Sequence, residues 1–180
     1  EDPWEMARMV ARKMPNTVKT CMAGAYFHTF EAPPPRSIVE LYYARLAEIG
    51  ALNRCQLTCN TTDQIKGPFR WIIPAFKEFG LKVCISLSYT ISPRHTDEYY
   101  AQKTREVVAF KPNAISLKDQ GGLLTVDRVR SLVPVVLQNA NGIPVELHSH
   151  CTTGLADLVY LEALKLGVRT LVNLTVDYME

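Results

Sequence analysis

The sequence lacks the features that mark membrane-spanning or nucleic-acid-binding proteins. No run of about 18 apolar residues occurs, so we expect no membrane insertion. The formal net charge is +2, from 20 basic and 18 acidic residues, which gives no strong field to attract nucleic acid or an anionic surface. The beginning of the chain also lacks the basic-then-apolar order of a signal peptide.

Two groups of short motifs are missing as well. Neither GxGxxG nor GxxxxGK[ST] follows any apolar run, which weakens a nucleotide-binding interpretation. The five cysteines are an odd number and show no CxxC pair or zinc-finger spacing. We therefore expect reduced cysteines that pack as small apolar side chains in a cytoplasmic protein.

Short apolar, often β-branched runs alternate with longer helical patterns along the chain. Strands are predicted at 17–25, 54–62, 82–90, 114–120, 144–150 and 170–177. Helices are predicted at 3–13, 35–50, 67–79, 95–110, 125–140 and 153–166. This alternation favours a parallel α/β sheet within one domain.

The regular spacing of the six predicted strands is typical of a (β/α)8 barrel, but a doubly wound sheet would show it too. A complete barrel has eight strands and about 250 residues. The chain is therefore either an open sheet or part of a barrel.

Four of the predicted strands are polar on one face and apolar on the other. The polar faces consist of Cys84, Ser86, Ser88 and Thr90; of Ser116, Lys118 and Gln120; of Glu146, His148 and His150; and of Asn173, Thr175 and Asp177. A doubly wound sheet is covered by helices on both faces, so both faces should be apolar. One polar face favours a barrel, whose interior opens at the carboxyl ends of the strands.

The stretch "ELHSH" (146–150) suggests a metal site. His148 and His150 are two residues apart on a strand, so both rings point the same way and can converge on one ion. The alternative is two histidines that end a strand and bond to backbone groups. Lys118 lies near the end of the preceding strand. Its ammonium group would repel a metal ion, whereas a carbamylated Lys118 would offer an oxygen ligand.

Four segments resemble biotin-dependent carboxyltransferase domains, as found in the oxaloacetate decarboxylase alpha chain and the carboxyltransferase subunit of pyruvate carboxylase. They are "EDPWEMARMVARKMPN" (1–16), "SYTISPRHTDEYY" (88–100), "ISLKDQGGLLT" (115–125) and "VELHSHCTTGLADLVYLEALKLGV" (145–168). The segments stand in the family's order and nearly span the chain. The resemblance implies that residues 1–180 are a partial carboxyltransferase-type TIM-barrel domain, with about six of the eight β/α units.

The same resemblance implies an enzyme that moves a carboxyl group between carboxybiotin and pyruvate or oxaloacetate. A divalent metal ion (Zn, Mn or Co) and biotin on a partner carrier domain are the implied cofactors. The implied site residues are Lys118, His148 and His150 as metal ligands, Lys118 and Asp119 as catalytic residues, and Gln120, Ser88 and Thr90 as substrate-binding residues. Asp119 is expected to hold a neighbouring group.

The sequence also departs from the family's pattern. The family's first two strands, with the aspartate ligand of "RDxHQS", and its later "GTSQP" segment with a proton-shuttling threonine are not found here. Six strands alone would leave two sheet edges open, so we expect such a chain to misfold, to form a homo-oligomer or to be completed by another segment. Ala23 and Gln56 stand where the family has arginines, and Cys59 stands where it has an aspartate.

These departures keep two other functions open. The first is an inactive, truncated barrel segment with a structural or assembly role. The second is a metal-dependent, aldol-type lyase of the same superfamily, whose members share the HxH pair but lack the lysine of "KDxxGLL". Carbamylation of Lys118 would distinguish a carboxyltransferase from such a lyase.

Overall fold

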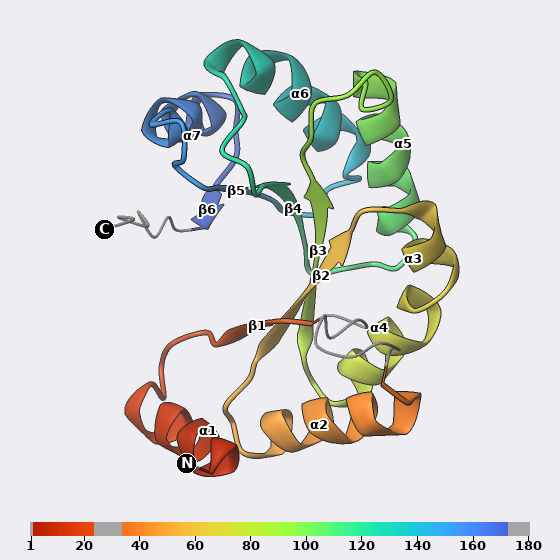
Figure 1. Cartoon of the computed structure of the whole chain (residues 1–180), viewed down its shortest axis with the longest axis vertical. Helices are drawn as coiled ribbons and strands as arrows, with labels where there is room; N and C mark the ends of the chain where they lie inside the picture. The colour runs from red at the N-terminus through yellow and green to blue at the C-terminus, as the bar shows by residue number, and fades with distance from the viewer. Residues whose placement is uncertain (1, 24–33, 173–180) are drawn as a thin grey trace. The chain divides into compact units, whose positions relative to one another are not determined.

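The computed structural model of the 180-residue chain describes residues 2–23 and 34–172. Strands and helices alternate along these residues (Figure 1). The strands are β1 (Thr20–Met22), β2 (Arg54–Cys59), β3 (Lys82–Ser88), β4 (Ala114–Asp119), β5 (Val145–Ser149) and β6 (Thr170–Val172). The helices are α1 (Pro3–Lys13), α2 (Arg36–Glu48), α3 (Thr62–Lys66), α4 (Phe69–Glu78), α5 (Asp97–Val108), α6 (Val126–Asn139) and α7 (Ala156–Lys165).

The sheet has six strands in the order of the sequence, from β1 to β6. The pairs β1–β2, β4–β5 and β5–β6 are parallel, as expected where each connection contains a helix. The predicted parallel α/β fold is thereby confirmed. The chain divides into two compact units, Glu1–Cys84 and Ile85–Glu180. No helix in the described ranges, 2–23 and 34–172, is long and apolar enough to cross a membrane.

Most predicted helices, and the strands predicted at 82–90, 114–120 and 144–150, are present with slightly shorter bounds. The predicted strands at 17–25 and 170–177 extend beyond the described residues, within which they correspond to β1 and β6. The region after β2 was predicted wrongly. The strand expected at 54–62 ends at Cys59, and the unpredicted helix α3 begins at Thr62. A capping box starts this helix: Thr61 Oγ1 accepts from the Gln64 N–H, and Gln64 Oε1 accepts from the Thr61 N–H. Gly67 and Pro68 then separate α3 from α4.

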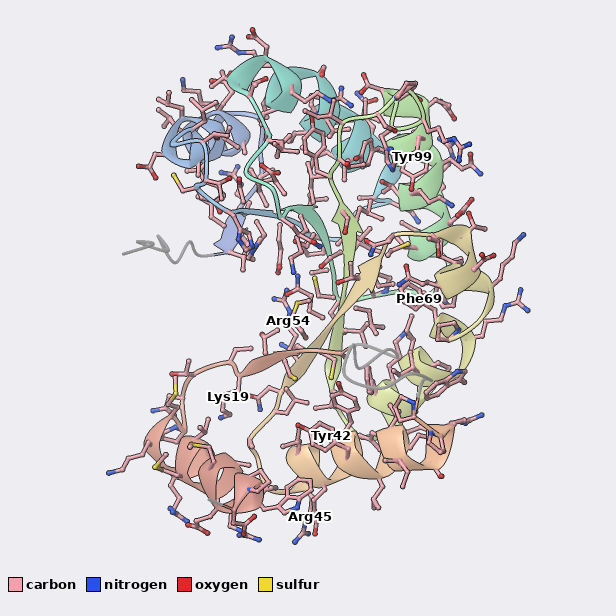
Figure 2. All side chains as sticks on the ribbon, viewed as in Figure 1. Lys19, Tyr42, Arg45, Arg54, Phe69 and Tyr99 are labelled. Atoms are coloured by element: carbon pink, nitrogen blue, oxygen red, sulfur yellow. The ribbon has the colours of Figure 1, made fainter. Side chains whose placement is uncertain are left out.

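In the unit Glu1–Cys84, aromatic side chains join the helices. Trp4 of α1 lies against Tyr42 of α2, which Figure 2 labels, with ring centroids 5.8 Å apart. Tyr43 of α2 meets Phe76 of α4 edge to face at 4.8 Å, and both rings are almost completely buried. Such tilted and edge-on contacts are the favoured geometries of aromatic pairs.

In the unit Ile85–Glu180, the helices α5, α6 and α7 lie on one side of β4, β5 and β6 (Figure 1). The apolar stripe of α6 shows the i, i+3, i+4, i+7 spacing of a helix that packs on one face. It consists of the buried residues Val129, Leu132, Val133 and Val136. Every residue of β4 is buried, polar ones included. The core of this unit therefore contains polar as well as apolar strand residues.

The register between strands settles which residues share a face. Lys118 on β4 is the partner of His148 on β5, so their side chains lie on the same face, as predicted. On β6, however, the partner of His148 is Val172. The expectation that the apolar residues of strand 170–177 face away from His148 is therefore wrong for Val172. Alternation within one strand does not determine its register with the next, and a one-residue shift exchanges the faces. Asn173, Thr175 and Asp177 lie outside the described residues.

All five cysteines are free, as the sequence predicts. Cys55, Cys59 and Cys84 are buried, but Cys21 and Cys151 are only half-buried, so the expected burial holds for three of them. Burial raises the pKa of the Cys55 thiol to about 12, because a buried thiolate loses its hydration.

Thiol labelling of the native chain should therefore separate the cysteines. Cys151 should react first with a water-soluble disulfide reagent, whereas Cys55 and Cys84 should react only as fast as the protein opens, because reaction needs an accessible thiolate. Peptide mapping after timed quenching measures the order. Equal rates for Cys55 and Cys151 in native buffer would contradict the described burial, and denaturant should make the rates converge.

Candidate functional site

The predicted metal ligands meet at the carboxyl ends of β4 and β5. Lys118, which is 7% exposed, pairs in register with His148. His150 follows β5, and its ring centroid lies 5.0 Å from that of His148 at an interplanar angle of 62°. The structure thus brings together the lysine and the two histidines that the sequence pattern placed on one face.

His148 has an unusual environment. Both ring nitrogens are buried, and neither finds a hydrogen-bond partner among the residues that the structure describes. Buried polar side-chain atoms normally have such a partner. Burial lowers the pKa of His148 to about 4. The charges of Lys118 and His150 also lower this pKa, whereas the charge of Asp119 raises it. The imidazole is therefore neutral at pH 7 and offers a lone pair on one nitrogen.

Within residues 2–23 and 34–172, no three His, Cys, Asp or Glu side chains gather as a metal site. Two histidines alone would leave two of the four positions of a tetrahedral ion to other groups. Lys118 is the neighbouring side chain that the sequence offers as a third ligand, and only in a modified form.

Asp119 lies on the face of β4 opposite Lys118, as strand alternation requires. Its Oδ1 accepts from the Leu123 N–H at 2.8 Å. Its Oδ2 accepts from the Leu124 N–H at 2.9 Å and from the Ser149 hydroxyl at 2.8 Å. The carboxylate is completely buried. Asp119 therefore holds neighbouring groups, in line with the expectation from its place beside Lys118.

Two of the predicted substrate-binding residues are in contact. Gln120 Nε2 donates to Ser88 Oγ at 3.2 Å, which links the ends of β3 and β4. Thr90 lies beyond the end of β3, and its N–H donates to Tyr100 Oη at 3.1 Å. Thr90 borders a pocket of about 400 Å³ whose lining includes neither Ser88 nor Gln120, so the structure groups Ser88 with Gln120 and places Thr90 apart from them.

This pocket lies where β3 ends and α5 and α6 begin. Its lining includes Tyr89, Leu123, His95 and Arg128. The polar groups are already engaged with one another: His95 Nδ1 lies 2.7 Å from Ser92 Oγ, and Arg128 forms an ion pair with Asp97.

Two buried tyrosines that the sequence pattern did not indicate as site residues support the strand ends. Tyr160 Oη of α7 accepts from the Ser149 N–H at 2.8 Å and lies 3.0 Å from the Val172 carbonyl oxygen. Tyr100 Oη of α5 makes the corresponding contacts with Thr90 N and the Ser88 carbonyl. A tyrosine within the apolar stripe of a helix could have indicated such a contact from the sequence, because a buried phenol needs a hydrogen-bond partner.

The loop after β4 packs closely on the loop after β5. Thr152 Oγ1 donates to the Gly121 carbonyl at 2.5 Å, and Thr153 Oγ1 donates to the Gly122 carbonyl at 2.6 Å. Gly122 has a φ of +62°, and a Cβ there would lie 2.3 Å from the His150 carbonyl oxygen. Only glycine fits this close approach, which ties the "QGG" loop to the histidine segment.

No family model matches the chain. A pyruvate carboxylase subunit of Methanocaldococcus jannaschii is 29% identical over 168 residues, which cover 93% of this chain and 29% of that protein. The 2-oxoglutarate carboxylase large subunit of Hydrogenobacter thermophilus is 27% identical over 170 residues, covering 93% of this chain and 26% of that protein.

Solved structures give the decisive likeness. The carboxyl transferase domain of Rhizobium etli pyruvate carboxylase, determined with pyruvate and biocytin, matches with a TM-score of 0.83 at 23% identity. The match covers 97% of this chain and 30% of that chain. The fold is that of a carboxyltransferase domain. The predicted resemblance and the partial TIM barrel are thereby confirmed, and the chain spans less than a third of the length of these relatives.

Replacement of Gly122 should destabilise the carboxyltransferase-fold chain more than a matched change at Gly142. Both have positive φ, but a Cβ at Gly142 meets nothing within 4 Å. Gly142→Ala should cost about 1–2 kcal/mol for the left-handed backbone. Gly122→Ala should cost a further 1–3 kcal/mol or so for the steric overlap. Urea unfolding measures both, and equal losses would contradict the close loop contact.

His148 should make the chain less stable in mild acid. Its pKa is about 4 in the folded chain and 6.5 in an unfolded one, so the unfolded state binds the proton first as the pH falls. The contribution is fully retained above pH 6.5 and is lost progressively as the pH falls towards 4. NMR titration of the ring reports the folded pKa. The matched variant His148→Leu should show a shallower loss of stability over the same window, and an unchanged slope would contradict the assignment.

Proposed function

We propose that this chain contributes an active site that moves a carboxyl group between biotin, carried on a partner domain, and pyruvate or oxaloacetate. The relatives named as pyruvate carboxylase subunits and the carboxyltransferase fold support this reaction class. The observation that carries the proposal within the chain is the meeting of Lys118, His148 and His150 on one face, at the strand ends. That is where barrel enzymes hold their catalytic groups.

The two histidines fit a shared divalent metal ion. Imidazole nitrogens bound at about 2.0–2.1 Å to one ion would place the ring centroids roughly 4.5–5.3 Å apart for angles between 90° and tetrahedral. The ring centroids of His148 and His150 are 5.0 Å apart. His148 is also neutral and lacks a hydrogen-bond partner among the described residues, as suits a ligand whose nitrogen awaits an ion. When bound, the ion would act as a Lewis acid on the carbonyl oxygen of the oxo acid.

Lys118 would supply a third ligand to this site as a carbamate. The neutral Nζ amine adds to the carbon of CO₂, a new N–C bond forms, and one proton is released. The product carries one negative charge and two oxygen atoms in place of an ammonium group that would repel the ion. Lys118 is 7% exposed and is the register partner of His148, so its position suits a ligand beside that ring.

The substrate would lie against Ser88 and Gln120, whose side chains already meet at the same strand ends. The hydroxyl and amide groups offer both donors and acceptors to a small oxo acid. Ala23 and Gln56, where the resemblance has arginines, are both buried and are joined by a backbone hydrogen bond of 2.7 Å. Neither side chain carries the positive charge that an arginine would bring to these positions.

Metal and carbamate analysis of the purified chain tests the proposed site. After dialysis against Co²⁺ in bicarbonate buffer, the chain should retain the metal and gain the mass of one CO₂ at Lys118. His148→Ala and His150→Ala should each weaken Co²⁺ binding by at least about 10- to 100-fold. The matched control is His95→Ala, because that ring bonds to Ser92 at the other pocket and should leave Co²⁺ affinity unchanged. A metal-free chain with an unmodified Lys118 would rule the site out.

Activity is tested on the longest natural protein that contains this sequence. Isotope exchange between labelled pyruvate and oxaloacetate should require biotin, be blocked by avidin and fall when Lys118 becomes alanine. Cleavage of an oxo acid that avidin leaves untouched would instead identify a lyase. Absence of both activities, together with a metal-free site, would identify a structural segment.

A further inference from the structure

A second pair of residues lies directly behind the proposed ligands. Asp119 follows Lys118 on β4, and Ser149 stands between His148 and His150 on β5. The register pairs Asp119 with Ser149, just as it pairs Lys118 with His148. Because side chains alternate along a strand, this second pair points to the face opposite the proposed ligands.

The pair is joined by a short, buried hydrogen bond. Ser149 Oγ donates to Asp119 Oδ2 at 2.8 Å, and the two residues are 2% and 0% exposed. The Asp119 carbonyl also accepts from the His150 N–H at 3.0 Å. A side-chain and a backbone hydrogen bond therefore both connect the end of β4, which carries Lys118, to the end of β5, which carries the histidines.

Each member of the pair is fixed by a further group. The Asp119 carboxylate accepts the Leu123 and Leu124 N–H groups, which anchors the loop after β4. The Ser149 N–H donates to Tyr160 Oη from α7. A hydrogen bond to a buried carboxylate is stronger than one between neutral groups, and a network in a low dielectric holds its members rigidly.

We propose that Asp119 and Ser149 are positioning residues that set the separation and angle of Lys118, His148 and His150; this rests on the metal-dependent function proposed above. Both side chains lie on the face opposite the proposed ligands. Loss of their hydrogen bond frees the two strand ends to shift relative to each other, so that the three ligands no longer converge. Residues of this kind affect metal affinity nearly as much as some ligands do.

Substitutions at Ser149 test the inference through Co²⁺ affinity. Ser149→Ala removes the hydroxyl and should weaken binding by about 10- to 100-fold, while the chain remains folded. Ser149→Thr and Ser149→Val have nearly the same shape and differ in the hydroxyl. Thr should preserve affinity and Val should lose it. The control is Thr104→Ala, which removes a buried hydroxyl that donates to the Tyr100 carbonyl within α5, and it should leave Co²⁺ affinity unchanged.

Two metal-free measurements keep this test separate from that of the proposed function. Asp119→Asn should speed the hydrogen exchange of the Leu123 or the Leu124 amide, because one of the two acceptor oxygens is replaced by a donor. Ser149→Ala should shift the ring resonances of both His148 and His150, whereas Ser149→Thr should not. If the wild-type chain binds no Co²⁺, the proposed metal site is wrong. The His148 and His150 ring resonances of the Ser149 variants then still test whether Ser149 positions these rings. Unchanged ring resonances in Ser149→Ala, or equal losses for Thr and Val, would overturn it.

Discussion

The parallel pairing of β4 with β5, in the register that aligns Lys118 with His148, is the constraint on which the site depends. It places a lysine and two imidazoles on one face and Asp119 with Ser149 on the other. The second pair supports the position of the first. The buried hydrogen bond behind the sheet keeps the strand ends together, and the loops after them are joined through Gly122 and the threonines that follow His150.

The polar face has a cost in stability that the fold by itself does not explain. Ser116 Oγ and both ring nitrogens of His148 are buried without a hydrogen-bond partner in the part of the chain that the structure describes. An unsatisfied buried polar group costs about 1–3 kcal/mol, so an apolar residue would serve stability better at such a position. Violations of this kind concentrate where a protein binds or reacts. The low pKa of His148 has the same origin, since burial disfavours the imidazolium.

The comparisons and the geometry support the function at different levels. The relatives that match 93% of the chain at 27–29% identity are named as carboxylases. The solved carboxyl transferase domain shares the fold. The chain's own residues then narrow the chemistry. The lysine beside the HxH pair favours carboxyl transfer over aldol-type cleavage. Ala23, Gln56 and Cys59, which lie in the unit Glu1–Cys84, depart from the family's pattern.

The sequence by itself determined most element types, the fold class and the HxH pair, because these depend on local periodicity and on motifs within one segment. It also placed Lys118 on the polar face of its own strand. The tertiary structure alone decided how the strands align, which put Val172 beside His148 and Ser149 beside Asp119. Helix α3 is not predicted, because the threonines at its start also continue the β-branched pattern of the preceding strand. Register, and the partners of Tyr100 and Tyr160, depend on contacts between segments far apart in the chain, and alternation within one strand carries no information about them.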